Sequence, residues 1–300
     1  MDHAAHLLST RLASEAGPEL EKLSHHSNAK IRNKAREIRM AIHRKGVPRL
    51  RIETLGGFRV LRGDSPVAEK EWQGKKPRAI LKAIVASSSK GVLNEIIMEN
   101  IWPDAPFDKV GKNYKVALHR LRKALEPGID KALGSSYIHI KDDALYLDED
   151  LCEVDTHTFL SLIENGKTKE KEGDIKGALK HYNEAAALYK GDFLPEDLYA
   201  PWTELRREEL RNAYIALLSR IATLHENKGA MSKAISFYKK AIQISPILED
   251  AYQRLMVLYS NMGKRNEALK IYERCRKALR DELGVEPDQV TVALYEKILG

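Results

Sequence analysis

The sequence predicts a mainly α-helical protein with small β elements, arranged as two domains behind a short N-terminal segment. Three observations predict this fold class. A pattern of Gly, Ala and Tyr recurs between residues 173 and 275 at a spacing typical of stacked helix pairs. Residues 49–149 combine short alternating segments with three amphipathic helical patterns. The length of 300 residues suits two domains better than one.

Composition and cysteine usage exclude several classes of protein. With 43% hydrophobic and 31% charged residues the chain has a globular composition, and no apolar stretch is long enough for a membrane span. Asp2, Glu15 and Glu19 interrupt the N-terminal region, so we expect no secretory signal and a cytoplasmic location. Cys152 and Cys275 lie far apart without metal-ligand spacing, which indicates two buried thiols rather than a disulfide or a zinc site.

Charge is distributed unevenly along the chain. The net charge of +7 divides into +4 for residues 1–48, +5 for residues 49–148 and −2 for residues 149–300. Residues 109–125 contain six Lys or Arg and no carboxylate. A basic run can be a merely solvated helix face, and charge alone leaves that interpretation and nucleic-acid contact equally open.

Residues 49–104 predict a strand followed by two helices. The alternation over residues 50–60, interrupted by Gly56 and Gly57, indicates a strand with a bend or bulge. The first helix follows Trp72, and its apolar face comprises Ile80, Leu81, Ile84 and Val85, with Lys75, Lys76 and Arg78 at its start. The second helix ends before Pro103, and its apolar stripe comprises Leu93, Ile96, Ile97 and Ile101.

The third helix, over residues 110–125, carries the basic run. Its apolar positions recur at steps of four, three and four and therefore share one face: Tyr114, Leu118, Leu121 and Leu125. The opposite face and its flanks carry cations, one amide and one valine: Lys112, Asn113, Lys115, Val116, His119, Arg120, Arg122 and Lys123. Cations bond guanine edges or phosphates, Asn bonds adenine, and a methyl group contacts thymine. This combination favours the major groove of duplex DNA.

Residues 137–147 predict a terminal hairpin, because two apolar segments flank Asp142 and Asp143. Strands, three helices and a hairpin in this order form a winged helix-turn-helix, with the hairpin as the wing. The run of residues 116–125, the end of the second helix at residues 101–104 and the leading strands resemble the DNA-binding domain of OmpR/PhoB-type bacterial response regulators, over residues 49–149.

This resemblance implies roles for individual residues. The base-edge contacts would come from Lys112, Asn113, Lys115 and Val116. The phosphate contacts would come from His119, Arg120, Arg122, Lys123, Lys75, Lys76 and Arg78. His119 can equally be a surface histidine, and the three cations at residues 75–78 a solvated helix start. Lys141 would contact DNA from the wing, although the carboxylates of Asp142 and Asp143 replace the glycines usual there and would repel phosphate.

Residues 150–300 contain a 34-residue repeat. Residues Gly229, Ala234, Tyr238 and Ala241 recur 34 positions later as Gly263, Ala268, Tyr272 and Cys275. An earlier copy, displaced by an additional insertion of 22 positions, comprises Gly173, Ala178, Tyr182 and Ala185. Gly is expected to end one helix, Ala to let the next pack closely, and Tyr to fill the gap to the neighbouring repeat. The period and pattern are similar to tetratricopeptide repeats.

The insertion and the C-terminal tail carry a second resemblance. Residues 189–197, Pro201-Trp202, residues 282–288 and Leu294-Tyr295 resemble the bacterial transcriptional activation domain that follows the winged helix in regulators of the SARP class. The two resemblances occur in the order of that class. They imply a sequence-specific regulator, an activator rather than a repressor, that binds promoter DNA at direct repeats as a homodimer. They also imply that residues 150–300 mediate oligomerisation and regulation and contact RNA polymerase.

Residues 1–48 and the absence of catalytic motifs complete the prediction. The N-terminal segment is basic and helical, with Ile31, Ala35, Ile38 and Ile42 at helical spacing. A helical cap is the favoured interpretation, and a short docking helix or the remnant of a longer architecture are the alternatives. No nucleotide-binding, hydrolase or metalloprotease motif is present, so we expect no enzyme, cofactor or metal.

Two alternatives stay open: an interaction scaffold of tetratricopeptide type with a winged helix that does not bind DNA, and the output half of a larger ligand- or nucleotide-driven regulator.

Overall fold

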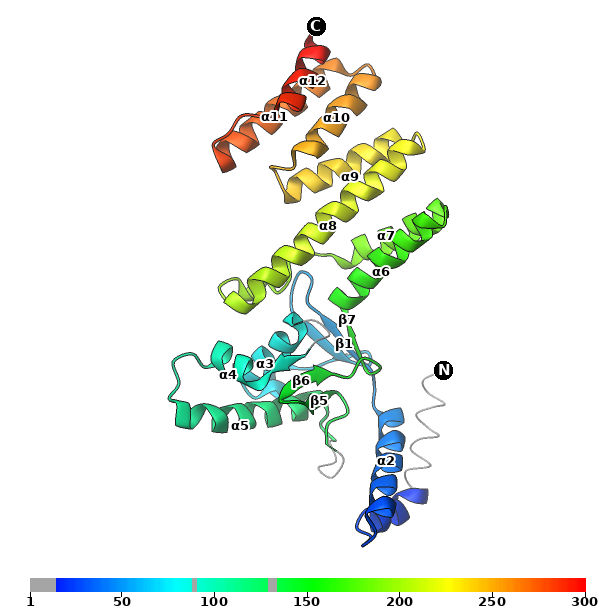
Figure 1. The fold of residues 1–300 in the computed structure, drawn as a ribbon, viewed down its shortest axis with the longest axis vertical. Helices are drawn as coiled ribbons and strands as arrows, with labels where there is room; N and C mark the ends of the chain where they lie inside the picture. Colours follow the sequence, from blue (N-terminus) through cyan, green and yellow to red (C-terminus); the bar gives the residue numbers. More distant parts are fainter. Residues whose placement is uncertain (1–14, 88–90, 129–133) are drawn as a thin grey trace. The chain divides into compact units, whose positions relative to one another are not determined.

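The computed structural model describes residues 15–87, 91–128 and 134–300 (Figure 1). The first 14 residues of the predicted N-terminal segment therefore lie outside it. The chain divides into unit 1, residues 1–157 and 194–206, and unit 2, residues 158–193 and 207–300. The prediction of a mainly helical fold with small sheets is confirmed.

The described part of unit 1 begins with helical residues 15–23 and helix α2, Ala29–Gly46. A sheet of strand order β3-β2-β1-β7 follows. The strands are β1 Leu50–Glu53, β2 Arg59–Arg62, β3 Ser65–Pro66 and β7 Cys152–Val154. β1 and β2 pair antiparallel, and Gly56 and Gly57 between them have φ of 96° and 148°. The single bent strand predicted over residues 50–60 is therefore wrong, because glycines that tolerate positive φ let the chain reverse completely.

The rest of unit 1 has the winged helix-turn-helix order. The elements are η1 Glu69–Trp72, α3 Lys75–Ala86, β4 Val92–Leu93, α4 Asn94–Ile101, α5 Phe107–Leu125, β5 Ile138–Lys141 and β6 Ala144–Leu147. The second sheet has the order β4-β6-β5, which confirms the terminal hairpin. The core of this region includes the fully buried Ile80, Leu81 and Leu121.

The predicted apolar stripe of the second helix is partly wrong. Ile97 and Ile101 are buried, but Leu93 and Ile96 are 45% and 44% exposed. Leu93 precedes α4 and pairs with Ala144 as part of β4, so strand geometry decides where its side chain points. Ile96 is one helical step, about 100°, from Ile97 and therefore leaves the buried face.

The first unit extends beyond the domain boundary expected at residues 149 and 150. β7 pairs parallel with β1, which places residues 152–154 in the first sheet. Residues 194–206 also belong to unit 1, because the Leu194 N–H donates to the Thr54 carbonyl at 2.9 Å. In addition, the buried Lys82 forms ion pairs with Glu196 at 2.9 Å and Asp197 at 2.5 Å. Residues 152–154 therefore join unit 1 by strand pairing. Residues 194–206 join it by a backbone hydrogen bond and by the ion pairs of Lys82.

Unit 2 consists of helices that follow the predicted repeat. The helices are α6 Asp155–Lys171, α7 Ile175–Leu188, α8 Pro201–Asn227, α9 Met231–Ile244, α10 Glu249–Asn261, α11 Arg265–Leu283 and α12 Gln289–Leu299, of which the first residues of α6 and α8 lie in unit 1. The repeat glycines, Gly173, Gly229 and Gly263, follow the ends of α6, α8 and α10 with φ of 79°, 71° and 70°. The repeat Ala and Tyr positions are buried. The helix-pair interpretation of the repeat is confirmed.

Close helix packing in the first repeat depends on Gly166 of α6. A Cβ at this position would lie 2.3 Å from the ring of the buried Tyr182. Alanine is normally better than glycine inside a helix by about 1 kcal/mol, but here the clash outweighs this gain. We expect Gly166→Ala to lower the free energy of unfolding by about 2 kcal/mol in urea denaturation. Asn165→Ala, one position earlier and exposed, is the control, and an equal loss in both would contradict the packing argument.

Both cysteines are free and buried, as the spacing predicts. Burial, with smaller contributions from Glu249 and Asp288, raises the pKa of Cys275 from 9.0 to about 12. Between these values the unfolded chain loses the thiol proton first, so stability is present below pH 9 and falls as pH rises.

Cys275→Ala should reduce the alkaline loss of stability. Alanine fits this position because Ala241 occupies the same place in the preceding repeat. We expect the slope of unfolding free energy against pH above pH 9 to flatten by up to about 1.4 kcal/mol per pH unit, measured by urea denaturation. An unchanged slope would show that other groups, such as the buried tyrosines, cause the alkaline loss.

Candidate nucleic-acid interface

Helix α5 separates a buried apolar face from an exposed polar face. Tyr114, Leu118, Leu121 and Leu125 are buried, which confirms the predicted apolar face, and α5 packs against α3. Seven of the eight polar-face residues predicted on this helix are exposed: Lys112, Asn113, Lys115, Val116, His119, Arg120 and Lys123. We call these seven the basic face of α5. They present cations, one amide and the 44% exposed Val116 on a single rigid helix.

Arg122 departs from that face. At about 100° per residue it lies beside the apolar stripe, and its side chain is half-buried. Its Nε is buried without a hydrogen-bond partner, and burial lowers the pKa of Arg122 while the nearby Tyr114 raises it. The same burial raises the pKa of Tyr114 to about 12. Arg122 therefore packs along the edge of the core rather than projecting from the basic face.

The three cations at the start of α3 also differ in whether they make contacts within the protein. Lys75 is exposed. Lys76 donates from Nζ to the Ile101 carbonyl at the end of α4 and lies 5.4 Å from the centre of the Trp102 ring. Arg78 forms an ion pair with Glu69 at 2.6 Å and packs over the rings of Phe58 and Trp72. Among the contacts of the described residues, Lys75 has no comparable hydrogen bond, ion pair or ring contact within the protein.

The wing ends in a tight turn with two acidic residues. Asp142 and Asp143 have φ of 50° and 58°, the backbone of a type I′ turn. Both carboxylates and Lys141 are exposed at this tip. The turn geometry confirms the predicted hairpin, whereas a DNA contact from Lys141 stays a prediction.

The double substitution Asp142→Asn, Asp143→Gly at the tip should affect stability and binding together. Glycine tolerates positive φ, so we expect about 1 kcal/mol more stability in urea denaturation. Removal of two carboxylates should tighten DNA binding several-fold at low salt, measured by fluorescence anisotropy. The control, Asp142→Asn with Asp143→Asn, removes charge without adding glycine, and weaker binding of both variants would contradict the electrostatic argument.

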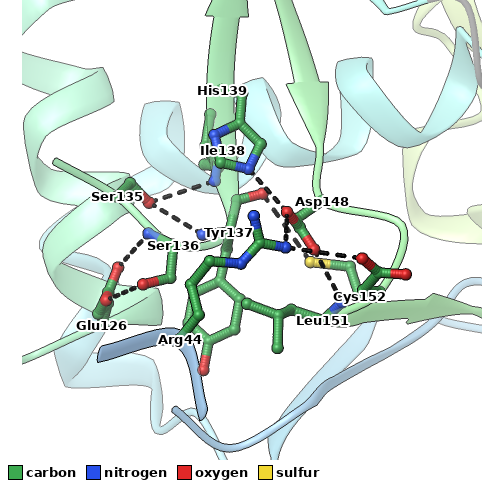
Figure 2. Close-up of polar contacts among 11 residues, drawn as sticks. Arg44, Glu126, Ser135, Ser136, Tyr137, Ile138, His139, Asp148, Leu151 and Cys152 are labelled. Atoms are coloured by element: carbon green, nitrogen blue, oxygen red, sulfur yellow. Dashed lines mark hydrogen bonds and ion pairs between the residues drawn. The ribbon is translucent and has the colours of Figure 1, made fainter. Parts of the chain in front are cut away.

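A buried polar network joins the end of α5 to the wing and to α2 (Figure 2). Glu126, directly after α5, accepts from the Ser136 N–H at 2.9 Å and the Ser136 Oγ at 2.7 Å. Its Oε1 also lies 2.8 Å from His43 Nε2 of α2. Burial alone would raise the pKa of Glu126, but the hydrogen bonds from His43 and Ser136 outweigh it and lower the pKa.

The second carboxylate of the network is Asp148, which follows the wing. Arg44 of α2 forms an ion pair with it at 2.6 Å, and His139 Nε2 lies 2.8 Å from the same oxygen (Figure 2). Asp148 and Glu126 are 7% and 6% exposed. Sequence reasoning missed this network, because its partners are separated by up to 104 positions and share no motif.

Unit 2 contains a groove of about 660 Å³ between α6, α7 and α8. Its apolar lining includes Leu160, Ile163 and Leu217. Charged groups at the groove pair with one another, since Arg220 Nε donates to Glu170 at 2.9 Å and Lys167 binds Glu164 at 2.6 Å. Lys171 also lines the groove, which therefore combines an apolar lining with one cation more than its carboxylates.

The described residues form neither a metal-binding cluster nor a membrane-spanning helix. Within residues 15–87, 91–128 and 134–300, no group of three or more His, Cys, Asp or Glu residues could hold a metal ion. No helix in the described part of the chain is both long and apolar enough to span a membrane.

Comparison with known proteins identifies the second half of the chain. Residues 154–299 match the bacterial transcriptional activator domain family. The transcriptional regulatory protein MoaR1 of Mycobacterium tuberculosis is 23% identical over 228 residues, which cover 75% of this chain and 72% of MoaR1. The regulatory protein AfsR of Streptomyces coelicolor is 24% identical over 252 residues, 83% of this chain and 24% of AfsR. The chain belongs to the SARP class of transcriptional regulators.

A solved structure shares the fold of this SARP-class chain. EmbR of Mycobacterium tuberculosis, in complex with a low-affinity phosphopeptide, superposes with a TM-score of 0.69 at 22% identity. The match covers 84% of this chain and 65% of the EmbR chain. The SARP-class chain thus spans about two thirds of that EmbR chain and about a quarter of AfsR.

Proposed function

We propose that this SARP-class chain binds double-stranded promoter DNA and reads its sequence in the major groove with the basic face of α5. The observation that carries the proposal is the exposed basic face itself. It has no carboxylate between residues 109 and 125, and it lies on a helix whose other side is locked into the core. A helix of this width fits the major groove.

The proposal separates base contacts from phosphate contacts. Lys112, Asn113, Lys115 and Val116 contact base edges. His119, Arg120, Lys123 and Lys75 contact phosphates and set affinity and its dependence on salt. Arg120 also donates to the Gln73 carbonyl at 3.3 Å, which holds its guanidinium at the surface. We leave out Arg122, Lys76 and Arg78, whose side chains are half-buried or bound within the protein.

We further propose that unit 2 mediates self-association and contacts RNA polymerase, and that the chain acts as an activator on direct repeats as a homodimer. The activator domain match and the helical repeats support this assignment. Light scattering with and without DNA tests the dimer. A monomer on DNA would overturn that part of the proposal alone.

The deciding experiment is a selection of genome fragments with the purified protein at two salt concentrations. We expect short direct repeats near promoters to be retained. Asn113→Ala should relax preference at one base position, whereas Lys123→Ala should weaken binding to all sequences alike and lower the salt slope by about one. Failure to retain any fragment at low salt would overturn DNA binding and favour the interaction-scaffold alternative.

A further inference from the structure

Helix α2 is the most basic element of the described chain. Between Ala29 and Gly46 it carries seven Lys or Arg residues and a single acidic residue, Glu37. The basic residues are Lys30, Arg32, Lys34, Arg36, Arg39, Arg44 and Lys45. In the N-terminal half of the helix, Lys30, Lys34 and Arg36 are exposed.

The charges of the N-terminal half of α2 are unfavourable for the helix itself. Lys30 with Lys34, and Arg32 with Arg36, form like-charge pairs four residues apart. The first turn has no acidic residue, although the positive end of the helix dipole lies there. By contrast, His43, Arg44 and Lys45 in the last turn complement the dipole. Lys34 forms an ion pair with Glu37 at 3.0 Å, which offsets part of this repulsion. The repulsion that involves Lys30, Arg32 and Arg36 is left, and an external anion would relieve it.

The C-terminal end of α2 is fixed to unit 1 by two buried carboxylates. His43 binds Glu126 at the end of α5, and Arg44 binds Asp148 at the base of the wing. The first attachment reaches the end of α5, which the proposed function places on DNA, and the second reaches the base of the wing. Because these contacts hold one end of a continuous helix, the cations along the rest of it are held at defined positions.

We propose that α2 binds the phosphate backbone of duplex DNA beside the stretch read by α5. This inference rests on the proposed function. An 18-residue helix is about 27 Å long, which matches the length of about 8 base pairs of duplex. Cations spread along such a helix neutralise phosphates without reading sequence, so α2 adds affinity and length to the DNA site rather than specificity.

DNA fits α2 better than an anionic membrane. A membrane-surface helix needs a continuous apolar face, but Ala35 in the centre of the apolar stripe is buried within the protein. Ile31 and Ile38 on either side are exposed, at 40% and 39%, but the buried Ala35 between them interrupts the apolar face. Binding to anionic vesicles is therefore kept as an outcome of the test.

The test is the salt dependence of DNA binding by the full chain. The variant Lys30→Gln, Lys34→Gln, Arg36→Gln leaves His43 and Arg44 intact, and circular dichroism verifies its fold. The control, Lys228→Gln, Lys264→Gln, Lys277→Gln, removes the same charge from exposed lysines of unit 2. We expect the α2 variant to lower the slope of log affinity against log salt by about 2 to 3, with the sequence preference unchanged. Hydroxyl-radical footprints should shorten on one side by up to about 8 base pairs.

The outcomes separate this inference from the proposed function. A slope that changes no more than in the control, with wild-type sequence-specific binding intact, would overturn the role of α2 alone. Binding of the wild type, but not the α2 variant, to phosphatidylglycerol vesicles with an unchanged DNA slope would overturn it in favour of a membrane. Absence of any DNA binding by the wild type would overturn both.

Discussion

Replacing Lys112, His119 and Lys123 together with alanine should weaken DNA binding by about 100-fold at physiological salt. The three side chains are exposed along the basic face of α5. Each lost charged or bidentate contact weakens binding separately, and loss of the two lysines should lower the salt slope by about 2. None of the three packs in the core, so the midpoint of urea denaturation should stay near that of the wild type.

Fluorescence anisotropy on a selected operator fragment, repeated over a salt series, measures this effect. The matched control is Lys228→Ala, Lys264→Ala, which removes two charges from exposed positions of unit 2. An equal loss in both variants would show that binding follows total charge. In that case α5 would have no special role, and the major-groove proposal would be wrong.

Asp155→Ala should lower the stability of unit 1 by about 4 kcal/mol. The Asp155 Oδ2 accepts the N–H groups of Thr54 and Leu55 at 2.6 and 2.8 Å, and Oδ1 accepts the Thr54 hydroxyl at 2.6 Å. Thr54 is fully buried. Alanine would leave these donors unsatisfied, at a cost of about 1–3 kcal/mol for each buried group. Urea denaturation followed by tryptophan fluorescence measures the loss, since Trp72 and Trp102 lie in unit 1.

The control for this prediction is Asp174→Ala, the same substitution at the N-cap of α7 in unit 2, followed by circular dichroism because all three tryptophans lie in unit 1. There the carboxylate accepts a single backbone N–H, from Gly177 at 2.8 Å, so a loss of only about 1 kcal/mol is expected. Asp155→Asn keeps one acceptor oxygen and should fall between the wild type and Asp155→Ala. Equal losses for Asp155→Ala and Asp174→Ala would mean that the buried donors at Thr54 and Leu55 find other partners.

Much of the fold follows from the sequence by itself. The step pattern of Tyr114, Leu118, Leu121 and Leu125 sets the buried side of α5, because helical period is a local property. The 34-residue repeat predicts the helix pairs of unit 2, since glycine at positive φ ends a helix and buried Ala and Tyr side chains pack the next one. The apolar segments around Asp142 and Asp143 predict the wing, because the turn between two pairing strands is also a local property.

Tertiary structure alone decided which cations remain free to bind a partner. Periodicity places Arg122 at the border between the basic face and the apolar stripe, and only the tertiary structure shows that its side chain is half-buried near Tyr114. Sequence likewise marks α2 as basic, whereas its attachment depends on His43 and Arg44 meeting carboxylates 83 and 104 positions away. Local sequence determines period and turn geometry. Contacts between distant residues depend on how the elements pack, and burial and pairing of charge follow from that packing.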